Sequence, residues 1–137
     1  MKEFKINKYT SYFHDGTIHD IKYKKNKIII AIESAELRPE WNKDNIKLSK
    51  RNTISGNLYL ENFGNIRING QIYKEALIKN YDSSDVYTFE IHPNKVLLLI
   101  SWINYPPKLR EETPFSEYEI EAEKIYWENV PDLFDNN

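Results

Sequence analysis

The stretch that decides the fold is Lys95-Val-Leu-Leu-Leu-Ile-Ser-Trp102, which lies between a Pro93-Asn94 turn and Pro106-Pro107. In an extended chain, alternate side chains point to opposite faces, and here both sets are dominated by Val, Leu, Ile and Trp. Strands that are apolar on both faces usually lie centrally in a sheet, with both faces covered. We therefore expect this segment to be a central strand whose even-numbered and odd-numbered side chains are both buried.

Two hairpins are expected around this strand. Residues 17–23 and 27–37 are rich in isoleucine at alternate positions, and a short lysine-rich turn separates them. Residues 86–91 pair naturally with residues 95–105 across a three-residue turn that contains a proline. Each of these patterns therefore predicts a pair of antiparallel strands.

Turn-forming residues punctuate the rest of the chain. The turn that opens the first hairpin is Phe13-His14-Asp15-Gly16, in which we expect Gly16 to adopt a positive φ. Tight turns are also expected at residues 62–65 and at Asn69-Gly70, and a loop is expected at residues 82–85.

The other segments complete an all-β pattern. Residues 71–81 fit both helical and extended spacing, and we favour a strand because strands surround them. Further extended segments are expected at 4–13, 53–60, 66–68 and 115–130, with a polar connection at 39–51. About eight strands at this spacing predict an all-β fold: a single-domain antiparallel β-sandwich or partly open barrel over residues 1–137, with 131–137 as a frayed tail.

Composition limits the classes of protein to which this chain can belong. Of its 137 residues, 40% are hydrophobic and 14% are aromatic, which suits a β domain with a core of its own. The chain has no cysteine, which excludes disulfides, thiol nucleophiles and cysteine-ligated metal sites. No apolar stretch resembles a signal peptide or a transmembrane helix, so we expect a cytoplasmic protein that does not enter a membrane.

Two His-Asp pairs, His14-Asp15 and His19-Asp20, are the residues that come closest to a metal site. Their spacing matches no standard metal-binding motif, and His and Asp are common turn residues, so we expect no metal and no cofactor. The sequence also lacks the motifs of serine hydrolases, phosphate-binding loops and zinc proteases. His92, in a turn before Pro93, is a poor position for a catalytic base. We therefore expect no enzymatic activity.

Charge is distributed unevenly along the chain. Residues 1–30 carry seven lysines and three acids, whereas residues 111–137 carry one lysine and nine acids. The lysines of residues 22–27 surround Tyr23, but an isoelectric point of about 5.9 does not favour nucleic-acid binding. The two ends either neutralise each other in the fold or mark a surface for a partner.

The strongest candidate binding site is a row of four alternate carboxylates in the last strand: Glu117, Glu119, Glu121 and Glu123. On a strand all four point to one side. Because like charges on one side repel each other, folding alone does not favour this arrangement. The row is either a solvated outer face, or it meets basic groups from the chain's own lysines or from a protein partner with a basic surface.

The apolar pattern of the last strand changes phase after Glu123. Ile120 and Ala122 are apolar at even positions, whereas Ile125 and Trp127 are apolar at odd positions. One added residue, a β-bulge near residues 123–124, would keep a single apolar face throughout. A helix is the alternative, but the clean alternation before the change favours a strand.

The opening Phe13-His14-Asp15-Gly16, the isoleucine-rich hairpin after it and the late Trp127-Glu128 pair resemble features of several small bacterial families. Some members of this loose group are regarded as immunity proteins, which neutralise toxins delivered between bacteria. The resemblance covers the first hairpin and the last strand. It implies a cytoplasmic, non-enzymatic β protein and carries no binding residue over to this chain.

Two classes of function therefore stay open. The first is a protein-binding module, in its specific form an immunity protein that meets a toxin through the acidic strand face. The alternative is a small-ligand-binding or enzymatic β-barrel. A flat or convex acidic face would favour the first class, and a deep apolar pocket with a few polar groups would favour the second. The oligomeric state does not follow from the sequence.

Overall fold

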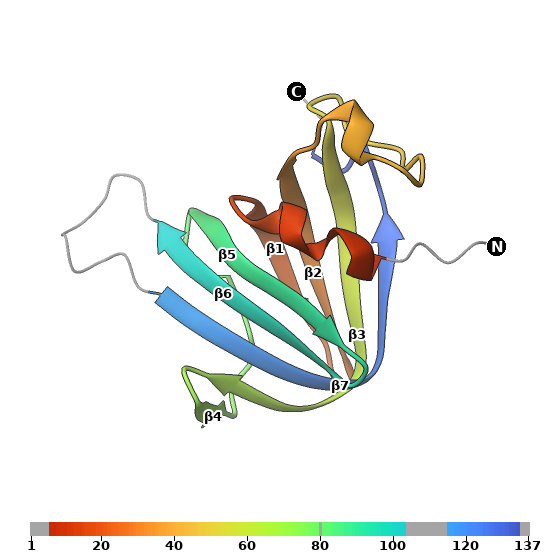
Figure 1. Ribbon diagram of the computed structural model, residues 1–137. Helices are drawn as coiled ribbons and strands as arrows, with labels where there is room; N and C mark the ends of the chain where they lie inside the picture. Colours follow the sequence, from red (N-terminus) through yellow and green to blue (C-terminus); the bar gives the residue numbers. More distant parts are fainter. Residues whose placement is uncertain (1–5, 80, 104–114, 135–137) are drawn as a thin grey trace.

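The chain folds into one antiparallel sheet, which a computed structural model describes over residues 6–79, 81–103 and 115–134 (Figure 1). The sheet has seven strands in the order β1-β2-β3-β7-β6-β5, with β4 paired to β3. In chain order the elements are η1 (Ile6–Phe13), β1 (Thr17–Tyr23), β2 (Lys27–Glu36), η2 (Pro39–Trp41), β3 (Thr53–Ile68), β4 (Gln71–Tyr73), β5 (Ser83–His92), β6 (Lys95–Ile103) and β7 (Phe115–Asn129), where η marks a 3-10 helix. The predicted all-β antiparallel fold is confirmed.

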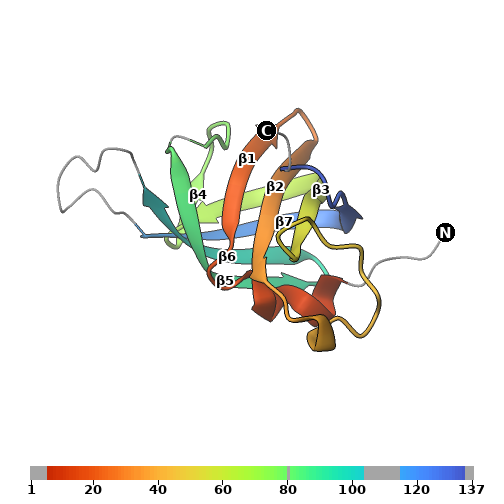
Figure 2. The ribbon, with the colours of Figure 1, turned by 90° about the horizontal axis from the view of Figure 1, so that it is seen from above.

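The sheet folds over on itself because β3 and β7 are long and bend. The hairpin β1–β2 pairs with the first half of β3, whereas the hairpin β5–β6 pairs with the first half of β7. At the bend, Asn62 takes a positive φ of 52°. The pairing of β3 with β7 shifts by one residue between Phe63 and Ile66. The two halves of the sheet therefore face each other without closing into a barrel (Figures 1 and 2).

The core lies between the two halves of the sheet. Every strand except β4 contributes buried apolar side chains. The largest core side chains with almost no exposed surface are Phe13, Ile18, Ile28, Ile30, Ile32, Leu37, Ile54, Leu58, Leu60, Leu98, Ile100 and Trp102. The even-numbered side chains of β6 are thus buried, as predicted.

The first element, η1, covers part of this core. Phe13 is fully buried, and its ring lies edge-on to Phe89 and Trp127 at centroid distances of 5.0 and 5.9 Å. The prediction of an extended segment at 4–13 is wrong over the described residues. Ile6 and Tyr9 are three positions apart, which places both on the buried face of a 3-10 helix.

Strand β6 is central in the sheet but covered on one face. Leu98 is 2% exposed, whereas Leu97 and Leu99 are only half-buried. No second layer of the described residues covers their side of the sheet, so the prediction that both faces of this strand are buried is wrong. An apolar strip is left on the outer face.

Both predicted hairpins are confirmed, and the turn before the first one works differently from the prediction. Asp15, not Gly16, takes the positive φ, at 70°. Glycine is required at position 16 because a Cβ there would lie 2.3 Å from the carbonyl oxygen of Glu33. The tight turn at Asn69-Gly70 is confirmed, with φ values of 54° and 84°.

Several element boundaries differ from those predicted. Residues 62–65 form a bend within β3 rather than a turn between two strands, and β4 covers only the start of the predicted strand 71–81. The predicted loop at 82–85 belongs mostly to β5. The predicted strand end at 104–105, the connection 107–114 and the end of the predicted tail at 135–137 lie outside the described residues. Within the described ranges, no helix is long and apolar enough to cross a membrane.

The predicted phase change in the last strand is present. Glu123 and Lys124 are both exposed, and buried positions are even-numbered before them and odd-numbered after them. The register between β7 and β3 is regular across residues 123–124 and shifts between Phe63 and Ile66, where β3 has the extra residue. The prediction of a β-bulge near residues 123–124 is therefore wrong.

Candidate functional site

Three of the four predicted carboxylates form a row on the outer face of β7. Glu117, Glu119 and Glu121 point away from the core, because the side chains between them are buried. The pairing of β7 with β6 places Glu117 opposite Leu99 and Glu119 opposite Leu97. Residues directly opposite each other in an antiparallel pair share a face and lie close together. Two of the three glutamates therefore lie beside the half-buried leucines of β6, and Glu121 lies opposite Lys95.

The fourth carboxylate, Glu123, lies at the bend of β7. It follows the row in sequence, but the adjacent Lys124 is exposed as well. Because the buried positions of β7 change from even-numbered to odd-numbered here, Glu123 does not continue the row of the other three glutamates. Its neighbour Lys124 also carries a positive charge.

One arginine of the chain opposes part of the row. Arg67 of β3 places Nη1 3.4 Å from Oε2 of Glu119 and 3.7 Å from Oε2 of Glu121. These groups are partly exposed, and exposed ion pairs contribute only about 0–1 kcal/mol to stability. Glu117 makes no ion pair with the part of the chain that the structure describes. The chain's own charges thus offset the row only in part.

An apolar group lies beside the row. Phe115 of β7 is 55% exposed and Tyr87 of β5 is 38% exposed, and their ring centroids are 5.2 Å apart. Tyr87 lies where the pairing of β5 with β6 shifts register. Together with Leu97 and Leu99 these two residues form what we call the apolar centre. Groups of exposed large apolar side chains often mark binding surfaces.

Carboxylates border the apolar centre on two sides. On the β5 side, Asp85 shares a row with Ser101 and Phe115, and Glu90 pairs with Leu97. On the β7 side are the three glutamates of the row. The apolar centre and its carboxylate border are here called the acidic face, whose acids are Asp85, Glu90, Glu117, Glu119 and Glu121. The basic groups on this side are fewer: Lys95 of β6, Arg67 of the neighbouring β3, and His92 of β5, whose Nε2 lies 3.1 Å from Oε1 of Glu90.

The sequence indicated the acids of β7 but not the apolar centre. The apolar pattern of β6 predicts that Leu97 and Leu99 are buried, and no local feature of the sequence brings Tyr87 next to Phe115. Their apolar character at odd-numbered positions of a strand was the only signal available.

The two His-Asp pairs do not converge on one point. Nδ1 of His14 lies 2.9 Å from the carbonyl oxygen of Tyr87, whereas Nε2 of His19 lies 3.0 Å from Oε1 of Glu33. The carboxylate of Asp20 accepts a hydrogen bond from the next backbone N–H. Among residues 6–79, 81–103 and 115–134, no group of three or more His, Asp or Glu side chains is placed to hold a metal ion.

A buried carboxylate, Glu33 of β2, was not identified from the sequence. Its Oε2 accepts hydrogen bonds from Thr53 Oγ1 at 2.6 Å and from Arg51 Nη2 at 2.7 Å. Nε2 of His19 lies 3.0 Å from its Oε1. Burial raises the pKa of the Glu33 carboxyl, but the hydrogen bonds from Thr53, Arg51 and His19 outweigh burial and hold the pKa below its ordinary value. This carboxylate ties three segments together and stabilises the fold.

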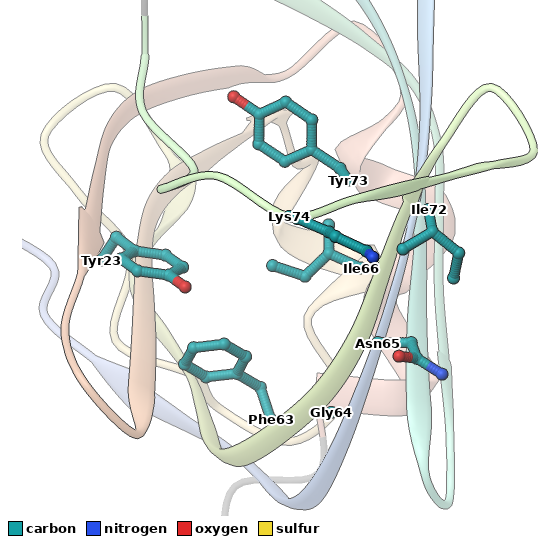
Figure 3. A pocket seen from close by; sticks show the side chains of 8 residues that line it. All are labelled: Tyr23, Phe63, Gly64, Asn65, Ile66, Ile72, Tyr73 and Lys74. Atoms are coloured by element: carbon teal, nitrogen blue, oxygen red, sulfur yellow. The ribbon is translucent and has the colours of Figure 1, made fainter.

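A cleft of about 250 Å³ opens between the end of β1, the bend of β3 and β4 (Figure 3). Its lining shares no residue with the acidic face. The lining residues are Tyr23, Phe63, Gly64, Asn65, Ile66, Ile72, Tyr73 and Lys74. The cleft is open to solvent and smaller than the roughly 300–1,000 Å³ of typical ligand pockets.

Comparisons of the chain with protein-family models, with curated proteins and with solved structures give no match. The fold and the acidic face therefore rest on the chain's own residues.

Proposed function

We propose that the protein is a non-enzymatic protein-binding module and that the acidic face is the surface on which its partner docks. The observation that carries this proposal is an exposed apolar centre bordered by carboxylates on the outer, convex side of the folded sheet. Protein interfaces typically combine an aromatic and aliphatic centre, which excludes water, with a polar border.

The chemistry of the acidic face selects the kind of partner. Phe115, Tyr87 and the two leucines suit an apolar anchor, and the surrounding carboxylates suit lysines or arginines around that anchor. Opposite charge on two surfaces raises the rate of association and selects against acidic partners. A bacterial toxin with a basic surface has this chemistry, so an immunity protein is the specific form of the proposal. The resemblance at residues 13–16 and 127–128 supports this form.

The proposal is tested with two variants that change the net charge equally. The row variant is Glu117→Gln/Glu119→Gln/Glu121→Gln, and the matched control is Glu36→Gln/Glu40→Gln/Glu75→Gln, whose three glutamates are exposed elsewhere. A partner is captured from a bacterial lysate with the unaltered chain and identified. Its association rate with each variant is then measured on a biosensor surface at low and high salt.

We expect the row variant to associate roughly tenfold more slowly at low salt, because electrostatic steering contributes about that much or more to the rate. The difference should shrink at high salt, since ions screen exposed charges. The control variant should retain the original rate. Equal rates for the two variants at low salt would contradict the proposal.

A further inference from the structure

Three of the eight residues that line the cleft beside β4 are aromatic, and a backbone hydrogen bond joins the segments that carry two of them. The N–H of Asn62 at the bend of β3 donates a hydrogen bond of 2.7 Å to the carbonyl oxygen of Asn26 in the β1–β2 turn. This bond fixes the end of β1 against the bend. As a result the rings of Tyr23 and Phe63 lie side by side, with centroids 5.2 Å apart.

The cleft is lined by aromatic and aliphatic side chains together with polar groups. Figure 3 shows Tyr23, Phe63 and Tyr73 arranged around the hollow, with Ile66 between them. Ile66 is 4% exposed and belongs to the core, whereas Tyr23 and Ile72 are among the exposed large apolar residues. Aromatic side chains around a hollow of this kind suit a flat apolar ring, which they contact by stacking or edge-on.

A positive charge lies at the same cleft. Lys74 is part of its lining, and in Figure 3 its side chain lies beside Ile66 with the ammonium end toward Ile72. Lys74 is exposed and makes no ion pair with the described part of the chain. Lys24 and Lys25, next to Tyr23 in sequence, are also exposed. Of the nearby acids, Glu61 already accepts a hydrogen bond from a tyrosine of β7, and Glu75 follows Lys74 in sequence.

We propose that this cleft binds a small anion built on a flat aromatic ring system. The ring lies among Tyr23, Phe63 and Tyr73, and the anionic group lies beside the ammonium group of Lys74. A volume of about 250 Å³ suits a fused ring with a short acidic substituent rather than a larger ligand. An aromatic carboxylate and a nucleoside monophosphate share this chemistry.

The test is an NMR titration of ¹⁵N-labelled protein with two pairs of probes. Indole-3-acetate is compared with uncharged indole-3-ethanol, and adenosine 5′-monophosphate is compared with uncharged adenosine. We expect at least one anion to cause saturable shifts of the amide signals of Tyr23, Phe63 and Tyr73. That anion should bind up to about fivefold more tightly than its uncharged counterpart, which is the gain that one exposed charge contact provides. The pair that responds identifies the anion as a carboxylate or a phosphate.

Two lysine variants assign the preference for an anion to one residue. Lys74→Met removes the charge from the cleft, and Lys43→Met removes an exposed charge near η2, which lies far from β4 in both Figures 1 and 2. We expect the anion to lose its advantage over its uncharged counterpart only in Lys74→Met. The proposal is overturned if neither anion gives saturable shifts at the cleft, if charged and uncharged probes bind equally, or if the advantage persists in Lys74→Met.

Discussion

At the scale of single residues, neighbouring leucines of β6 occupy different environments. Leu98 is 2% exposed, between the two halves of the sheet, whereas Leu99 lies half-buried on the outer face. Composition alone does not separate them, because both belong to one apolar run. Only the fold determines which side of the strand is covered.

We predict that Leu98→Ala lowers the free energy of unfolding by about 2–5 kcal/mol, because it leaves a cavity in the core. The same truncation at Leu99 should cost less than about 1.5 kcal/mol, since part of this side chain is already in water. Urea denaturation followed by tryptophan fluorescence measures both values. Equal losses for the two variants would show that the outer face of β6 is buried after all.

The buried carboxylate Glu33 makes stability depend on pH. Its pKa in the folded chain lies below the ordinary value of 4.5, so the folded state favours the charged form. The resulting stabilisation is present above pH 4.5 and is lost as the pH falls through the folded pKa. We predict that Glu33→Gln costs about 1–3 kcal/mol at neutral pH, because its partners lose a charged acceptor.

The same variant should unfold with a weaker dependence on pH between neutral and acidic conditions. Thermal unfolding at several pH values measures this dependence. Glu36→Gln, which replaces an exposed carboxylate at the end of β2, serves as the control. A cost that stays constant from pH 7 down to below the folded pKa would contradict the assignment.

At the scale of elements, the bend shared by β3 and β7 determines the architecture. Two glycines of β3 differ in their surroundings: Gly64 lies within the bend, and Gly56 lies near the start of the strand. A Cβ at Gly56 would lie 2.1 Å from the carbonyl oxygen of Glu128 and 2.8 Å from the Trp127 ring. A Cβ at Gly64 would meet the flexible side chain of Glu121 at 3.3 Å.

We predict that Gly56→Ala destabilises the protein by at least about 1–3 kcal/mol, since β7 would have to move away from β3. Gly64→Ala should change stability by no more than about 0.5 kcal/mol, as surface substitutions usually do. Chemical denaturation of the two variants measures the difference. Similar values would show that the contact between β3 and β7 yields easily at Gly56.

The sequence predicted the elements whose signal is local. Both hairpins and the Asn69-Gly70 turn follow from alternation and from turn residues. The helix η1 was missed because its apolar positions, Ile6 and Tyr9 among them, were interpreted as part of an extended segment. The bend at Asn62 was predicted as a chain reversal, because a turn residue in sequence does not show whether the strand continues beyond it.

At the scale of the whole molecule, the folded-over sheet buries one face and exposes the other. That arrangement explains why the row of Glu117, Glu119 and Glu121 was predictable and its apolar neighbours were not. The glutamates alternate within one strand, whereas Tyr87 and Phe115 meet only because β5, β6 and β7 lie side by side. The cleft likewise joins β1, β3 and β4, whose contact the local sequence does not reveal.

The central claim is that the acidic face, rather than another surface, meets the partner. Hydroxyl-radical footprinting tests it most directly, because aromatic side chains react readily when they are exposed. Phe115 and Tyr87 lie in the apolar centre, and Trp41 and Tyr23 are exposed elsewhere, at 38% and 37%. We predict that the captured partner protects Phe115 and Tyr87 from oxidation while Trp41 and Tyr23 keep their reactivity. Protection of Trp41 or Tyr23 with Phe115 still reactive would contradict the account.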